Sequence, residues 1–132
     1  MTPIGRTRAR GIETLTLDSP HNRNALSAAL VGELASSLAD CAKEDAVRAI
    51  VLTHTGNTFS AGADLKDPPD PAALVELLRQ IVELGKPVVA RITGHVRAGG
   101  LGLLAACDIA AASTESTFAF TEVRIGVAPA VI

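Results

Sequence analysis

The sequence predicts an α/β domain with a largely parallel sheet. Short β-branched and apolar runs alternate along the chain with stretches in which apolar residues recur every three or four positions. The segments between them are rich in Gly, Pro, Asp and Asn, which favours turns. Helices between strands form crossovers, and crossovers place the joined strands parallel to one another. At 132 residues the chain fits one domain.

The first predicted elements are a strand, a helix and a second strand. Residues 11–17 place Leu15 and Leu17 on one side of an extended segment that stops at a turn-forming Asp-Ser-Pro cluster. Ser27 is placed to cap an amphipathic helix that runs to about residue 45. Residues 47–53 form a β-branched run that predicts a buried strand.

The second half of the chain repeats this alternation with shorter elements. Residues 58–69 are rich in Gly, Asp and Pro, and we expect them to form a functional loop. Asp70 and Pro71 supply a capping carboxylate and a ring-fixed first residue for a helix that Gly85 ends. The remaining predicted elements are a strand at 87–92, a loop at 94–100, a short helix from about 98 to 107, a strand at 109–112 and an extended segment at 117–120.

Composition argues against several classes of protein. Twelve Lys and Arg against 14 Asp and Glu give a net charge of −2, whereas a nucleic-acid binder usually has a basic face. The two cysteines have no close Cys or His neighbour, so we expect neither a disulfide framework nor a zinc site. No window approaches the ~18 apolar residues of a membrane span. We therefore expect a cytoplasmic protein without a metal, a membrane or a nucleic-acid partner.

Two glycine-containing loops each follow a predicted strand. They are residues 59–65 (FSAGADL) and residues 97–102 (RAGGLG). Ligands of α/β sheets gather at the carboxyl ends of strands, and glycine lets backbone N–H groups approach a ligand closely. Either loop alone also fits an ordinary tight turn before a helix.

Four ordered motifs together resemble the crotonase family, also called the enoyl-CoA hydratase/isomerase family. They are residues 20–26 (PHNRNAL), 59–66 (FSAGADLK), 94–108 (GHVRAGGLGLLAACD) and 121–129 (TEVRIGVAP), at the approximate spacing of the family. The resemblance covers nearly the whole chain. It implies a crotonase-like ββα spiral, the ClpP/crotonase fold.

The last residues of the sequence bear on whether the chain forms a whole domain. Residues 126–132 (GVAPAVI) stop on an apolar stretch without a closing element, and such a stretch would leave apolar surface open to water. Family members are longer and end in helices that complete the pocket and drive trimer formation. We therefore expect residues 1–132 to be the N-terminal core portion of a crotonase-like domain, incomplete at the C-terminus because the C-terminal helical part is absent. The resemblance implies a homotrimer or hexamer at full length.

The resemblance also implies an oxyanion hole. In the family, two backbone N–H groups hold the oxygen of an acyl-CoA thioester, and by position these fall on Ala63 and Gly99. Fixed donors of this kind stabilise the charge that develops as the thioester becomes an enolate. Gly99 should begin a helix, whose positive dipole end would act on the same oxygen.

The same resemblance implies contacts with coenzyme A. CoA is part of the substrate, so no separate cofactor is expected. Long cationic side chains gain by pairing with phosphate oxygens, although Arg23 and Lys66 also fit ordinary solvated surface charges. The residues expected to bind CoA are Arg23, Ser60, Ala61, Gly62, Asp64, Leu65 and Lys66.

The acid/base residue implied by the resemblance is Glu122. It lies among apolar neighbours, and a partly desolvated carboxylate is expected to have a raised pKa suited to proton transfer. Well-known hydratases of the family carry two glutamates, and Gly102 occupies the position of the first one here. A related branch that hydrates branched or glutaconyl-type acyl-CoA substrates shares this glycine, so Gly102 does not exclude hydration.

Three functions remain open on this basis. The first is hydration of a 2-enoyl-CoA through an enolate held in the oxyanion hole, as in fatty acid metabolism. The second is Δ3,Δ2-enoyl-CoA isomerisation, for which one glutamate suffices. The third is non-catalytic binding of an acyl-CoA, which Gly102 would also fit.

Overall fold

The computed structural model describes residues 2–132, which fold into two sheets and three α-helices. A five-stranded sheet has the strand order β1-β2-β3-β5-β7, and a three-stranded sheet has the order β4-β6-β8. The strands are β1 (Ile4–Ala9), β2 (Ile12–Leu17), β3 (Ala49–His54), β4 (Thr58–Ser60), β5 (Val88–Ile92), β6 (His95–Arg97), β7 (Ile109–Ala112) and β8 (Phe118–Ala119). The helices are α1 (Ala28–Lys43), α2 (Pro71–Glu83) and α3 (Gly99–Ala106), with 3₁₀ turns η1 (Pro20–Asn22) and η2 (Glu122–Ile125).

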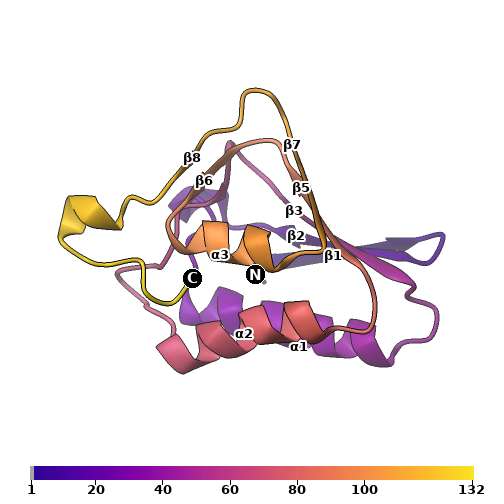
Figure 1. The fold of residues 1–132 in the computed structure, drawn as a ribbon. Coiled ribbons are helices and arrows are strands. Elements are labelled where there is room, and N and C mark those ends of the chain that lie inside the picture. The colour runs from indigo at the N-terminus through magenta and orange to yellow at the C-terminus, as the bar shows by residue number, and fades with distance from the viewer. Residues whose placement is uncertain (1) are drawn as a thin grey trace.

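The strands follow a repeating spiral. β3 is followed by β4, β5 by β6 and β7 by β8, so each turn of the chain gives one strand to each sheet. Every strand pair is parallel except β1 with β2. The predicted α/β class with a largely parallel sheet is therefore confirmed. In Figure 1, α1 and α2 lie side by side along one side of the molecule, and α3 lies closer to the strands.

The predicted helix starts are confirmed by their hydrogen bonds. The Ser27 hydroxyl accepts a hydrogen bond from the backbone N–H of Leu30 at 3.0 Å, and the Asp70 carboxylate accepts one from Ala72 at 3.0 Å. Each bond satisfies a backbone donor that a helix leaves free at its first turn. α2 ends at Glu83, with Leu84 rather than the expected Gly85 as its C-cap.

Three strands differ from the expectations. β1 was not predicted, because most of its residues are exposed and polar or charged. It pairs with β2 through a turn in which Arg10 and Gly11 have positive φ angles of 55° and 78°. β4 and β6 lie inside segments expected to be loops. They have three residues each, so only pairing with distant neighbours defines them as strands.

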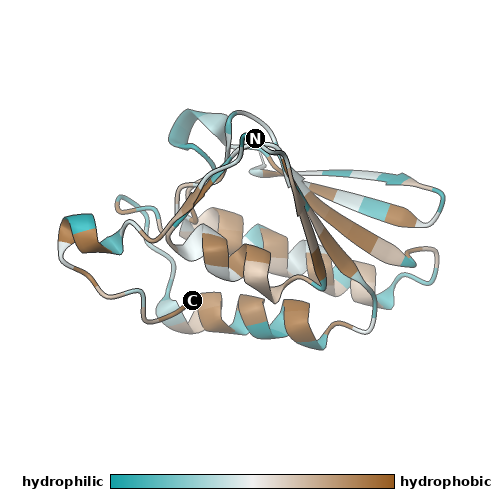
Figure 2. Cartoon of the chain, turned by 45° about the horizontal axis from the view of Figure 1, so that its top comes forward, coloured by the Kyte–Doolittle hydropathy of each residue, from teal (hydrophilic) through white to brown (hydrophobic). Residues whose placement is uncertain are grey.

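The core lies between the large sheet and the helices. It consists mainly of Leu, Ile and Val from β2, β3, β5, α1 and α2, and Phe59 is its one aromatic side chain among the described residues. Figure 2 shows hydrophobic residues along the large sheet and on the helices. The segment that carries η2 projects away from both in Figures 1 and 2.

Neither a membrane-spanning helix nor a cluster of metal ligands is found in residues 2–132. No helix there is long and apolar enough to cross a bilayer. No group of three or more His, Cys, Asp or Glu side chains in this part of the chain is arranged to hold a metal ion.

Candidate active site

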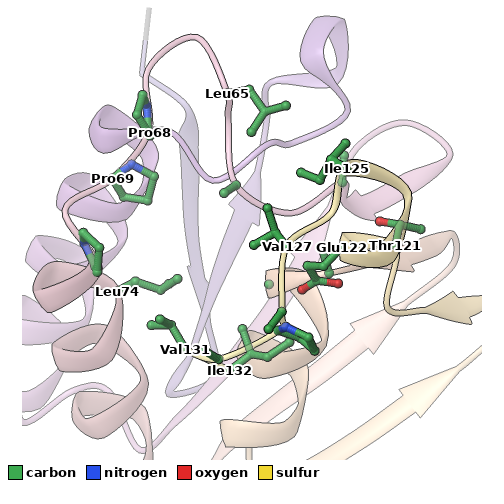
Figure 3. A pocket seen from close by; sticks show the side chains of 18 of the residues that line it. Leu65, Pro68, Pro69, Leu74, Thr121, Glu122, Ile125, Val127, Val131 and Ile132 are labelled. Atoms are coloured by element: carbon green, nitrogen blue, oxygen red, sulfur yellow. The ribbon is translucent and has the colours of Figure 1, made fainter.

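A cavity of about 540 Å³ lies where the two glycine-containing loops, the start of α2 and the C-terminal segment meet (Figure 3). Its volume is within the range of about 300–1,000 Å³ that is typical of small-molecule sites. The lining is mostly apolar, with Leu65, Leu74, Val127 and Ile132 among its side chains. Such a cavity suits an apolar group that is oriented by a few polar contacts.

The Ala63 amide is free to face a ligand because its neighbours are bonded on the other side of the chain. The Gly62 carbonyl accepts a hydrogen bond from Leu26 N–H at 2.7 Å, and Asp64 N–H donates to the Leu26 carbonyl at 3.0 Å. This short parallel bridge leaves the Ala63 N–H on the opposite edge, since successive N–H groups of an extended chain alternate in direction. Within residues 2–132 the Ala63 N–H donates no hydrogen bond.

Gly99 brings a second free amide to the same place. It is the first residue of α3, where backbone N–H groups have no partner within the helix. The Ala63 nitrogen lies 4.0 Å from where a Cβ on Gly99 would stand, and the Gly99 nitrogen lies 3.3 Å from where one on Gly62 would stand. The structure therefore brings Ala63 and Gly99, the pair expected from the sequence, together at the cavity.

The two loops are in close contact, and one residue at this contact is strained. Gly62 has a φ angle of 93°, and a Cβ there would lie 2.6 Å from the Cβ of Ala98. Ala98 itself has a φ of 50° and a ψ of −124°, which is an unfavourable conformation for a residue with a side chain. Backbone strain of this kind persists only where the surrounding structure enforces it, and it is concentrated at functional sites.

Glu122 is the acidic residue of the cavity lining. It begins η2, and its Oε1 atom is buried without a hydrogen-bond partner among residues 2–132. Figure 3 shows the carboxylate among apolar side chains such as Val127 and Ile132. Since an unpaired buried carboxylate oxygen is costly, this placement suits a group that exchanges a proton with a ligand.

Comparison with known proteins decides the family. The sequence profile of the enoyl-CoA hydratase/isomerase family matches residues 7–132. The chain belongs to this family. Crystal structures of members share its fold, so the predicted crotonase-like fold class is confirmed.

Three relatives illustrate the match. The structure of an enoyl-CoA hydratase from Mycobacterium avium is 48% identical, with a TM-score of 0.88 over 98% of this chain and 54% of that chain. The structure of human enoyl-CoA hydratase domain-containing protein 3 is 29% identical, with a TM-score of 0.92 over 98% and 55%. The 4-chlorobenzoyl coenzyme A dehalogenase-2 of an Arthrobacter species is 34% identical over 89% of this chain and 48% of its own length. The chain thus spans about half the length of the curated relatives it matches.

Gly102, where well-known hydratases of the family carry a glutamate, is tightly enclosed in this chain. A Cβ on Gly102 would lie 2.9 Å from the Cβ and 3.2 Å from the Cα of Ile132. A larger side chain therefore does not fit at this position while Ile132 packs there. Glu122 remains the one carboxylate of the lining among the described residues.

The residues expected to bind CoA fall into three groups. Ala61 and Leu65 line the cavity, and Leu65 is 75% exposed. Arg23 and Lys66 are exposed but lie outside the lining.

Ser60, Gly62 and Asp64 lie outside the lining as well, and they shape the loop. The fully buried Ser60 accepts a hydrogen bond from Gly62 N–H at 3.2 Å. Asp64 accepts one from Lys66 N–H at 2.9 Å.

Asn24, for which the sequence predicts no role, anchors the first motif. Asn24 is fully buried, and its Oδ1 accepts a hydrogen bond from Ser19 N–H at 2.7 Å. Its Nδ2 donates to the carbonyl oxygens of Thr55 at 3.1 Å and Thr58 at 2.8 Å. Asn tolerates the left-handed conformation found here, with a φ of 52°, and this is the signal that could have identified the turn.

Proposed function

We propose that the protein acts on an acyl-CoA thioester and stabilises its enolate between the N–H groups of Ala63 and Gly99. The observation that supports this most directly is the proximity of two unbonded amides at a cavity that Glu122 also lines. Donors fixed before the reaction act on developing charge without reorganising, and loss of one such donor costs about 2.7–4 kcal/mol in other acyl-transfer enzymes.

Hydration of a 2-enoyl-CoA is the reaction we propose first. The Glu122 carboxylate takes a proton from water as the water oxygen bonds to C3, and the electrons of the double bond move into the thioester to form the enolate. The protonated Glu122 then delivers the proton to C2. The product contains the elements of one water molecule, and the glutamate returns to its starting state.

Double-bond isomerisation is a second candidate, and the enclosed Gly102 favours it. With one carboxylate in the lining, Glu122 would take a proton from C2 of a 3-enoyl-CoA and return it to C4. The double bond then moves from C3–C4 to C2–C3 through a dienolate, whose oxygen the same two N–H groups would bind. No water needs to be held, so a second acidic group is not required.

The nucleotide half of CoA is proposed to lie along residues 60–66. Ala61 and Leu65 would contact it directly, because they line the cavity. The exposed Arg23 and Lys66 would pair with its phosphates. Ser60, Gly62 and Asp64 would contribute by holding the shape of this loop.

Parallel assays with crotonyl-CoA and a 3-enoyl-CoA test the proposal, with calorimetric titration of a saturated acyl-CoA beside them. Hydration consumes the conjugated enoyl thioester and isomerisation produces it, so absorbance changes of opposite sign separate the two reactions. Binding without turnover of either substrate would identify a non-catalytic acyl-CoA binding protein. Absence of binding would contradict the proposal.

A further inference from the structure

One buried residue touches both turns that supply the free amides. The backbone of Leu26 brackets Ala63, since its N–H donates to the Gly62 carbonyl at 2.7 Å and its carbonyl accepts from Asp64 N–H at 3.0 Å. The side chain of the same residue reaches Gly99, because its Cδ1 lies 3.2 Å from where a Cβ on Gly99 would stand. Leu26 itself is fully buried.

These two kinds of contact depend differently on residue type. The hydrogen bonds to Gly62 and Asp64 are made by the main chain, so they persist when the side chain at position 26 is changed. The contact with Gly99 needs the full length of the leucine side chain. Leu26 therefore acts as a spacer between a loop that it holds by hydrogen bonds and a helix start that it supports by packing.

Ala98, the residue before Gly99, is held by contacts of its own. Gly62 and Ala98 are in close contact, and Ala98 is held by a hydrogen bond from its N–H to the Ala119 carbonyl at 3.0 Å. Gly99 thus follows a residue that is held in place, and it packs against the side chain of Leu26. Removing the Leu26 side chain would leave the contacts of Ala98 and remove this packing.

We infer that Leu26 is a positioning residue that sets the separation between the Ala63 and Gly99 amides. The inference rests on the proposed function, in which both N–H groups bind one oxygen. Functional groups must be held to within about 0.5 Å to act together. A misplacement of about 1 Å can cost about 100-fold in rate.

The experiment compares Leu26→Ala with Leu38→Ala. Leu38 is a matched control because it is 1% exposed in α1 and loses the same atoms. Leu26→Met keeps the reach of the side chain, and Leu26→Val is a milder truncation in case Leu26→Ala does not fold. Crystal structures of the ligand-free variants give the distance between the two amide nitrogens. The infrared carbonyl stretch of a bound saturated acyl-CoA reports how strongly the amides polarise the thioester.

In Leu26→Ala and Leu26→Val we expect the separation of the two nitrogens to change by more than about 0.5 Å, which exceeds the tolerance of such sites. We also expect the carbonyl shift on binding to shrink and kcat to fall by about 10–100-fold, with a smaller change in KM. Leu26→Met should restore all three values, and Leu38→Ala should lower the melting temperature alone.

The inference is overturned if the separation of the nitrogens is the same in the wild type and the Leu26 variants. It is also overturned if Leu38→Ala reduces the carbonyl shift as much as Leu26→Ala does. If the wild type binds no thioester, the proposed function fails, while the ligand-free structures still decide whether Leu26 sets the spacing.

Discussion

Residues 4–104 and residues 105–132 contribute to the same cavity but are packed very differently. The buried side chains of the core all belong to the first region, from Ile4 to Leu103. In the second region all four residues of β7 are exposed, and Phe120 and Val123 are 57% and 80% exposed. The two amides come from the first region and Glu122 comes from the second.

This difference in packing indicates how the contributions of the two amides and of Glu122 can be tested separately. A pair of backbone donors keeps its geometry only if the chain around it is rigid, and the first region supplies this rigidity through the core and the bonds to Leu26. A carboxylate on a side chain needs less support from the core. Substitutions beside the two amides should therefore affect stability and activity together, while those in the second region should separate the two.

The largest effect is expected for Gly62→Ala, which tests the rigid region. Its φ of 93° and the distance of 2.6 Å to the Ala98 Cβ leave no room for a methyl group. We expect a loss of about 3 kcal/mol or more in the free energy of unfolding, together with loss of thioester binding. Urea denaturation and calorimetry measure the two effects. Gly32→Ala in α1 is the control, because a Cβ there meets nothing within 4 Å.

Glu122→Gln is expected to reduce turnover without reducing stability. The substitution keeps the shape of the side chain but removes the proton acceptor, so kcat should fall by about 100-fold or more. The melting temperature should change little, because Oε1 has no hydrogen-bond partner to lose among the described residues. The exposed Glu115→Gln provides the control. Turnover that survives Glu122→Gln unchanged would remove Glu122 from the mechanism.

Leu52→Ala and Phe118→Ala compare the stability of the two regions directly. Leu52 is 1% exposed in β3, so its truncation should cost about 2–5 kcal/mol. Phe118 is 48% exposed in β8, so its truncation should cost about 1 kcal/mol or less, although more atoms are removed. Chemical denaturation gives both values. A cost for Phe118→Ala equal to that for Leu52→Ala would show that the second region is packed as tightly as the first.

The smallest expected effect is a pH dependence that originates at His54. Thr93 N–H donates to its Nε2 at 3.0 Å, so the ring proton is on Nδ1, which faces the Thr55 carbonyl at 3.2 Å. Burial lowers the pKa of His54 below its ordinary value, and the bond to Thr55 opposes this only in part.

The sign of the pH effect follows from this lowered pKa. The unfolded chain binds a proton at His54 before the folded chain does, so stability is retained above about pH 6.5 and decreases as the pH falls towards the lowered value. Unfolding free energies measured across this range, with His54→Asn as the comparison, test the expectation. An NMR titration in which His54 takes up its proton at or above the ordinary histidine pKa of about 6.5 would contradict it.

The sequence predicts the parts of this molecule that carry local signals. The capped helices α1 and α2 and the strands β2, β3 and β5 follow from side-chain periodicity and from Ser27 and Asp70. β4 and β6 cannot be predicted in this way, because a strand of three residues is too short to show an alternating side-chain pattern. Their partner strands are also distant in the chain. β1 was missed for another reason: its charged side chains are paired with the buried Glu13 on β2.

The candidate site could be predicted from the sequence only in part, because some of its contacts join residues that are far apart in the chain. Resemblance to the family, rather than spacing, indicated that Ala63 and Gly99 act as a pair. The roles of Asn24 and Leu26 depend on contacts with residues far away in the chain, such as Thr58 and Gly99. An apolar residue that positions a backbone group has no sequence signature of its own.

The spiral order of the strands has a consequence for synthesis on the ribosome. Each new strand pairs with one from the preceding turn of the spiral, as β5 does with β3 and β7 with β5. A growing chain can therefore add each strand to a sheet edge that has already emerged, since folding during translation proceeds from the N-terminus. The tightly packed region is made first and serves as a template, and the segment that carries Glu122 joins it later.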